Sequence, residues 1–258
     1  MNDFFSLDIL ARWILKFGHI TVIMPCVVAG MIFHKRELYA KAACFLLFVM
    51  ILNTLLKQLF KVPLFPHLGN GYAFPSGHMH AATAFYGYIL YESKNKYVSS
   101  LIVVILSLLG WSLIHCNFHD CFDVLGAVGF ACLEFTVYHA LSSKFSAKTV
   151  GLLALFSAIF IMAFLNFIHC IQYHVWLAFY GLLGTEVALL ATHKTQTSFF
   201  FNVMTFAVVS VLIYGVYGVF KYLAFSHAYL SCIQFAMLPI IVVYVDNIVI
   251  KLTKARIY

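Results

Sequence analysis

Three clusters of polar residues interrupt a chain that is otherwise rich in Leu, Phe, Val, Ile and Ala. They are, in chain order, Lys57-x-x-x-Lys61, then Pro75-Ser76-Gly77-His78, then Ser112, His115 and His119-x-x-x-Asp123. A separation of four residues puts both members of the first cluster, and both His119 and Asp123, on one helix face. The spacing therefore predicts that charged and imidazole side chains gather at the ends of helices.

The residue types in these clusters describe a definite chemistry. A histidine with a carboxylate one turn away, as in His119 and Asp123, acts as a base or nucleophile that is held in one tautomer. A second histidine, His78, can supply the proton that a leaving group needs. The backbone amides of Ser76 and Gly77 at a helix start bind anionic oxygens, and a lysine adds a point charge for phosphate. Together these groups predict displacement at phosphorus by a histidine nucleophile, with no metal and no cofactor.

The composition indicates which elements must position these residues. The chain has 258 residues, of which 64% are hydrophobic, 17% aromatic and only 10% charged. A water-soluble domain of this length could not bury so much apolar surface. We expect an all-α, polytopic membrane helix bundle, because a segment in lipid must satisfy its own backbone hydrogen bonds.

Nine apolar stretches are long enough to be read as membrane spans. We place them at about 14–33, 40–60, 77–91, 97–115, 119–141, 149–169, 174–192, 199–221 and 228–250, since a span needs roughly 17–25 residues. The preceding segment at about 3–12 could be an interfacial helix. Within or near these spans, Glu134, Glu186 and Asp246 are costly acids that are as compatible with a structural role as with a functional one.

The distribution of Lys and Arg predicts the orientation of the bundle. Most of the 16 basic residues fall in one set of breaks between the spans, which the positive-inside rule assigns to the cytoplasm together with the C-terminus. The three polar clusters then face the periplasm, the cell exterior or an organelle lumen. The net charge of +7 follows from this topology and does not indicate a nucleic-acid partner.

Lys57, the Pro-Ser-Gly-His run at 75–78, and Ser112 followed by His119 and Asp123 resemble the motifs of the type 2 phosphatidic acid phosphatase superfamily. The resemblance covers about residues 40–170. It implies a six-helix membrane core that removes or transfers phosphate groups on lipids and related compounds. On this basis we expect a phosphatase-like unit over residues 1–171 and three additional transmembrane helices over residues 172–258.

The resemblance also implies roles for individual residues. His119 would form a phosphohistidine, Asp123 would orient it, and His78 would protonate the leaving group. The remaining candidate residues would hold phosphate oxygens, and they are Lys57, Lys61, Ser76, Gly77, Ser112 and His115. The expected partners are a membrane lipid substrate and the bilayer itself.

Two positions depart from the family pattern. Leu64 and Phe65 stand where the family has Arg-Pro, and Leu113 follows Ser112 where the family has arginine. Each charge-assisted hydrogen bond contributes roughly 1.5–3 kcal/mol, so the loss of two arginines would weaken binding of a phosphomonoester dianion.

Three accounts of the missing arginines are open. In the first, Lys61, His67, His80 or His115 replaces the lost charge and the protein is a phosphatase. In the second, the substrate is a phosphodiester with a single negative charge, and the protein transfers a phospho-headgroup. In the third, the site is a remnant on a scaffold that binds or moves lipid.

Two further features bear on these accounts. His78-x-His80 and His115-x-x-x-His119, with Asp120 and Asp123 nearby, have a spacing that would permit a zinc site, although such spacing is weakly specific. The segment from Lys61 to Phe74 contains two prolines and a Gly-Asn-Gly run, which exclude a regular helix. Its apolar residues are suited to the membrane surface, and we expect a lid or a headgroup-selecting loop.

Overall fold

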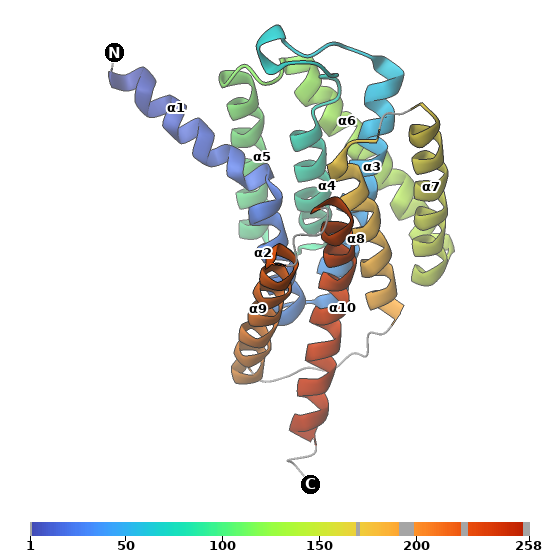
Figure 1. Ribbon diagram of the computed structural model, residues 1–258. Coiled ribbons are helices and arrows are strands. Elements are labelled where there is room, and N and C mark those ends of the chain that lie inside the picture. Colours follow the sequence, from blue (N-terminus) through green and yellow to red (C-terminus); the bar gives the residue numbers. More distant parts are fainter. Residues whose placement is uncertain (1, 169–170, 191–198, 223–226, 255–258) are drawn as a thin grey trace. The chain divides into compact units, whose positions relative to one another are not determined.

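The computed structural model describes residues 2–168, 171–190, 199–222 and 227–254. Its regular elements there are all helices, which confirms the expected all-α class (Figure 1). The α-helices are α1 (Asn2–Leu15), α2 (Ile20–Phe33), α3 (Arg36–Phe60), α4 (Gly77–Glu92), α5 (Lys96–His115), α6 (Cys121–Lys144), α7 (Ala147–Phe167), α8 (Tyr173–Leu190), α9 (Phe199–Tyr222) and α10 (His227–Lys254). Two short 3-10 helices are η1 (Lys16–Gly18) and η2 (Pro66–Leu68).

Each of the nine expected apolar stretches overlaps at least one described helix, but the number of membrane crossings is not thereby fixed. Among the described residues, four helices are long and apolar enough to cross a membrane, namely α3, α5, α6 and α7 from Lys148. A fifth span is possible if Leu7–Gly18 and Ile20–Phe33, which are bent by 47° at their junction, count as one. The structure therefore agrees with a membrane protein, and the count of nine stays a prediction.

The outward faces of these helices are strongly apolar. Phe122 on α6 and Phe160 and Phe167 on α7 are 78%, 74% and 80% exposed. Large exposed apolar patches are unusual on a soluble protein, because contact between apolar surface and water costs free energy. Lipid tails would cover these side chains, which supports the membrane assignment.

Polar caps define where several helices begin. Ser76, Asn95, Asp120 and Ser146 precede α4, α5, α6 and α7, and each accepts a hydrogen bond from an amide of the first helical turn. The first amides of a helix have no carbonyl partner within the helix, so such caps fix the residue at which the helix starts. Two of these caps, Ser76 and Asp120, lie in the predicted polar clusters.

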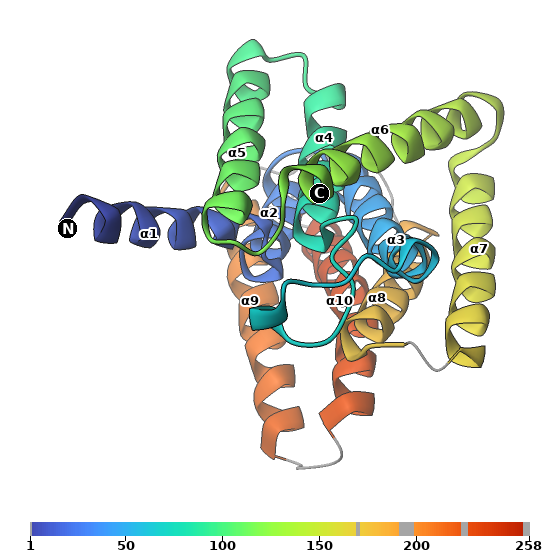
Figure 2. The same ribbon diagram turned by 90° about the horizontal axis from the view of Figure 1, so that it is seen from above.

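The first of two compact units comprises Met1–Pro25 and Phe45–Cys170. Within it α4 packs between α5 and α6 (Figures 1 and 2). Phe85 on α4 and Leu109 on α5 are completely buried, and Phe45 on α3 packs against Tyr88 and Tyr138 with ring centroids 6.2 Å and 5.4 Å apart. This packing brings the starts of α4 and α6 into one region.

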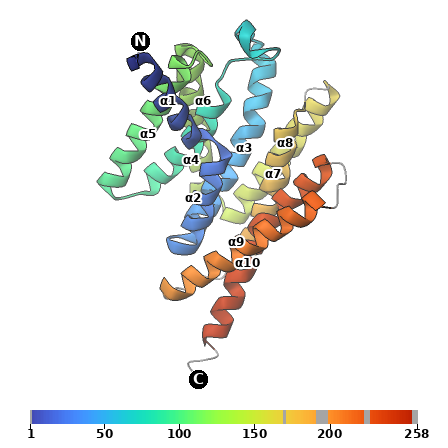
Figure 3. The same cartoon turned by 60° about the vertical axis from the view of Figure 1, so that its left-hand side comes forward.

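The second unit comprises Cys26–Cys44 and Ile171–Tyr258. In it α10 packs along α8 and α9 (Figure 3). The α8–α10 contact is close, since a side chain at Gly184 would collide with the backbone of Ala236. Glu186 on α8 lies near the Cys44 thiol. The side chain of Asp246, the third acid noted in the sequence, lies outside the described residues.

Candidate active site

The loop between α5 and α6 places His119. The carbonyl of Leu113 accepts hydrogen bonds from the amides of Phe118 and His119, at 3.0 Å and 3.3 Å. Asn117 closes this turn with a left-handed φ of 54°, which Asn tolerates better than most residues. Leu113, which stands where the family pattern has arginine, thus shapes the loop through its backbone.

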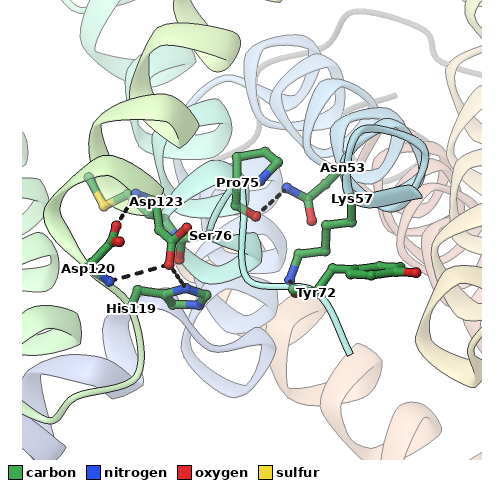
Figure 4. Close-up of polar contacts among 9 residues, drawn as sticks. Asn53, Lys57, Tyr72, Pro75, Ser76, His119, Asp120 and Asp123 are labelled. Atoms are coloured by element: carbon green, nitrogen blue, oxygen red, sulfur yellow. Dashed lines mark hydrogen bonds and ion pairs between the residues drawn. The ribbon is translucent and has the colours of Figure 1, made fainter. Parts of the chain in front are cut away.

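His119 and Asp123 form the central pair of the site (Figure 4). The His119 Nδ1 atom lies 3.0 Å from Asp123 Oδ2, and both residues are buried. Because the carboxylate accepts, Nδ1 carries the proton and Nε2 presents its lone pair. This is the orientation that a histidine nucleophile needs.

A capping box holds the carboxylate of this pair in place. Asp123 Oδ2 also accepts from the Asp120 amide at 3.3 Å, and the Asp123 amide donates to Asp120 Oδ1 at 2.7 Å. Reciprocal bonds of this kind satisfy two of the otherwise unpaired donors at a helix start. Asp123 therefore both begins α6 and orients His119.

The environment of His119 lowers its pKa below the ordinary value. Burial is the largest cause, because it disfavours the charged imidazolium. The hydrogen bond and the negative charge of Asp123 act in the opposite direction, whereas the positive charge of Lys57 lowers the pKa further. The net lowering keeps the ring neutral, and hence nucleophilic, near neutral pH.

The Pro-Ser-Gly turn lies directly against this pair. The Ser76 amide donates to the main-chain carbonyl of Asp123 at 3.1 Å, and Figure 4 shows Ser76 beside Asp123. Ser76 is fully buried, and its Oγ accepts from the Met79 amide at 3.5 Å. Gly77 is the first residue of α4, so the positive end of this helix dipole adjoins the His119 pair.

Lys57 stands near the end of α3 and is half-buried. Its Nζ donates to the Tyr72 carbonyl at 2.8 Å, which ties α3 to the following loop (Figure 4). The loop itself is closed by an antiparallel bridge between Pro63 and Tyr72. An ammonium group has three donors, so this bond leaves Lys57 capable of a further contact with an anion.

His78 and Lys61 are both exposed at this end of the unit. His78 lies in the first turn of α4, two residues after Ser76. Lys61 follows the last residue of α3 with a left-handed φ of 52°. The approach of the His78 ring to the His119 ring stays a prediction.

Two predicted phosphate ligands have other partners. Ser112 is fully buried, and its Oγ donates to the Leu108 carbonyl of its own helix at 2.8 Å. The His115 Nε2 atom lies 2.9 Å from Asp8 Oδ1 on α1, and its ring stacks on Trp111 with centroids 4.9 Å apart. Neither contact places these side chains with His119.

The sequence did not indicate that Asn53, His80 and Glu134 form a further polar group in this unit. Asn53 on α3 donates from Nδ2 to the Pro75 carbonyl at 3.3 Å, and the same nitrogen lies 3.1 Å from His80 Nδ1. On the far side of the ring, His80 Nε2 is 3.1 Å from Glu134 Oε2. No local spacing links positions on three different helices, so only the fold could bring them together.

Three of the histidines that suggested a zinc site contact different acids: His80 lies against Glu134, His115 against Asp8 and His119 against Asp123. Within the part of the chain that the structure describes, no group of three or more His, Cys, Asp or Glu side chains could hold a metal ion. A surface hollow of about 540 Å³ lies beside the α5–α6 loop and is lined by Phe65, His67, Cys116 and Asn117. In it the rings of Phe65 and His67 stack with centroids 5.9 Å apart.

No protein-family model matches this chain, and neither does any curated protein or solved structure.

Proposed function

We propose that the protein is a membrane lipid phosphatase or phosphotransferase that acts on a lipid-linked phosphate through a phosphohistidine. The observation that carries this proposal is the buried His119–Asp123 pair, joined through the Ser76 amide to the N-terminus of α4. A neutral nucleophile and an anion-binding helix end therefore adjoin each other. The resemblance of these residues to the type 2 phosphatidic acid phosphatase motifs supports the same reading.

The reaction would proceed in two displacements. His119 Nε2 attacks phosphorus, the N–P bond forms, and the bond from phosphorus to the leaving oxygen breaks. His78 delivers a proton to that oxygen. Asp123 stabilises the positive charge that develops on the imidazole. Water, or the hydroxyl of a second lipid, then attacks phosphorus and releases His119, and His78 accepts the proton of that nucleophile.

Two groups would bind the phosphoryl oxygens. The Gly77 amide lies at the positive end of α4, beside the bonded Ser76 amide. Lys57 supplies the positive charge that already acts on His119. These groups would stabilise the negative charge as it spreads over the phosphoryl oxygens in the transition state.

A phosphodiester transferase is the second candidate, and the distribution of charge supports it. Of the four residues that could replace the missing arginines, His80 lies against Glu134 and His115 against Asp8. Leu113 is 2% exposed, so the core would exclude a cation at that position. A diester with one negative charge needs fewer cations than a monoester dianion, and Lys57 could suffice for it.

The proposed site would face the periplasm, the cell exterior or a lumen, with the C-terminus in the cytoplasm, as the distribution of basic residues predicts. The loop from Lys61 to Phe74 supports entry from the membrane surface, since Val62 and Phe65 are exposed. A lipid headgroup could pass beside this loop into the hollow that Phe65 and His67 line. Its acyl chains would stay in the bilayer.

The proposal is tested by incubating the purified protein with vesicles that contain phosphatidic acid, an isoprenoid phosphate or a phosphodiester lipid. Release of inorganic phosphate would identify hydrolysis, and a new lipid species would identify transfer. His119→Ala should abolish either reaction while leaving the folded yield unchanged. If the wild type converts none of these lipids but moves them between leaflets, and His119→Ala moves them equally well, the scaffold account would replace this one.

A further inference from the structure

A chain of three buried polar side chains crosses the first unit beneath the Pro-Ser-Gly turn. Asn53 on α3 is 6% exposed, His80 on α4 is completely buried, and the Glu134 side chain on α6 is 10% exposed. Polar groups are costly inside an apolar bundle unless they are bonded to one another or serve a function. The proposed reaction mechanism assigns none of them a role.

The order of donors in this chain follows from its first member. The Pro75 carbonyl can only accept, so the Asn53 amide must turn its Nδ2 group toward it. The second hydrogen of the same Nδ2 group then points to His80 Nδ1, which must accept. The proton of a neutral His80 ring is therefore on Nε2, the atom that lies 3.1 Å from Glu134 Oε2.

The contact with Glu134 is short but poorly aligned. His80 Nε2 and both carboxyl oxygens of Glu134 are buried without a hydrogen bond of good geometry among the described residues. The ion-pair distance nevertheless places an acceptor at the proton-bearing nitrogen. Glu134 thus favours the tautomer that lets Nδ1 receive the Asn53 amide.

Asn53 on α3 and Asp123 in the first turn of α6 hold the same peptide group from two sides. The carbonyl of the Pro75–Ser76 peptide accepts from Asn53, and its N–H donates to the Asp123 carbonyl on α6. Gly77 follows at once, and a side chain on it would lie 3.3 Å from Asn53 Oδ1. Together with the Ser76 backbone angles, φ −59° and ψ 119°, the orientation of this peptide sets where the Gly77 amide points.

We propose that Asn53 and His80, with Glu134 behind them, are positioning residues that hold the Pro75–Ser76 peptide so that the Gly77 amide meets the phosphoryl oxygen. This inference rests on the proposed function, because it assigns the turn to phosphate binding. The three residues do not touch the substrate. They act through the turn, so their loss should reduce kcat more than it raises KM.

The sequence allows this single peptide group to be observed selectively by NMR. Pro75–Ser76 is the only Pro-Ser step in the chain, and Ser76–Gly77 is the only Ser-Gly step. Labelling the carbonyl carbon of proline with 13C and the nitrogen of serine with 15N therefore gives one NMR resonance for the held peptide. The serine and glycine pair of labels isolates the Gly77 amide in the same way.

The variants separate the hydrogen bond from the bulk of the ring. Asn53→Leu and His80→Leu remove the chain, whereas His80→Asn keeps an oxygen near the place of Nδ1. Thr83→Val is the matched control, because Thr83 is a buried hydroxyl without a partner in the described residues, on the same helix. If Asn53→Leu does not fold, Asn53→Ser replaces it, since serine is too short to reach the Pro75 carbonyl.

We expect the Pro75–Ser76 resonance to shift in Asn53→Leu and His80→Leu, and kcat on the best lipid of the panel to fall about tenfold or more. His80→Asn and Thr83→Val should leave the Pro75–Ser76 resonance at its wild-type position. Their rates should stay within about threefold of the wild type. Inorganic phosphate should shift the Gly77 amide of the wild type, and shift it less in the two leucine variants.

The possible failures are distinguishable. An unmoved Pro75–Ser76 resonance in both leucine variants would overturn the positioning role, whatever the activity. A moved resonance, together with a wild type that turns over no lipid and a Gly77 amide that ignores phosphate, would instead overturn the proposed function. A rate loss in His80→Asn as large as in His80→Leu would show that the ring acts by some property other than its acceptor nitrogen.

Discussion

At the scale of single residues, the site depends on the protonation state of His119. Burial lowers its pKa, Asp123 raises it and Lys57 lowers it, and the net pKa is below the ordinary value of about 6.5. A nucleophilic imidazole must be neutral. Activity should therefore persist below pH 6.5 and fall only as the pH drops through the lowered pKa of His119. His119 thus resembles a base tuned for neutral conditions more than a pH sensor.

Opposite substitutions should move this pKa in opposite directions. Asp123→Asn removes the charge that raises the pKa of His119, so the pKa should fall further. Lys57→Met removes a charge that lowers it, so the pKa should rise. Diethyl pyrocarbonate labels the neutral ring, and the pH midpoint of labelling at His119, measured by peptide mass spectrometry, should shift accordingly. Equal midpoints in both variants would contradict the electrostatic account of the site.

At the scale of elements, the first turn of α6 organises the site. It carries the capping box, and the next turn packs against the loop through Gly126, where a side chain would collide with the Phe74 ring. Phe74 directly precedes Pro75 and also packs on Phe60, with ring centroids 5.0 Å apart. The absence of a side chain at Gly126 is therefore what lets the loop reach the helix.

This close approach gives a prediction with a built-in control. Gly126→Ala should push Phe74 away and lower the thermal stability, by an overpacking cost of about 1–3 kcal/mol. Gly129→Ala, one turn along the same helix, meets nothing within 4 Å and should be neutral or stabilising, because alanine favours a helix more than glycine. Thermal unfolding of both variants in detergent checks this. Equal effects would show that the loop does not rest on Gly126.

How much could be foreseen depended on whether the interacting residues are close in the sequence. His119 and Asp123 are four apart on one helix start, so their spacing alone predicted the hydrogen bond that the structure shows. His115 binds Asp8, which is 107 positions away, and no local pattern could reveal that partner. The Asn53–His80 contact spans 27 positions and depends on how α3 and α4 pack.

Prediction of the membrane spans is limited in the same way, because contacts between distant residues can break a helix. The apolar composition of the stretch at about 14–33 predicts one continuous span, but Lys16–Gly18 forms a 3-10 turn and the direction changes by 47°. The Tyr86 hydroxyl on α4 donates to the Phe17 carbonyl at 2.9 Å, and buried Gly18 would crowd Leu109 if it had a side chain. Tertiary contacts of α4 and α5 thus stabilise a break that apolar composition does not indicate.

At the scale of the whole molecule, the length of α4 bears on how a lipid reaches the site. Its 16 residues extend about 24 Å, which is less than the roughly 30 Å of a hydrocarbon core. If α4 crosses the membrane as proposed, one of its ends lies below the surface plane. Because the shortfall is only about 6 Å, roughly one helical turn, a site at its N-terminus would still lie close to the lipid headgroups.

The proposed sidedness can be tested with two single cysteines in a background without other cysteines. His67→Cys lies in the loop before α4, and Lys94→Cys lies in the turn after it. Both positions are exposed. In intact cells, or in vesicles whose outer surface is the proposed lumenal side, a membrane-impermeant maleimide should label the first and spare the second. Labelling of both to the same extent would contradict a crossing by α4.

The most direct test of the proposed function is to look for a phosphorylated form of the protein. Protein mixed with a 32P-labelled lipid phosphate from the panel and quenched in alkali, which preserves phosphohistidine, should carry the label on His119. The label should be at Nε2, because Nδ1 donates a hydrogen bond to Asp123. His119→Ala should carry none. Turnover without a label on His119, or a label that persists in His119→Ala, would contradict the account.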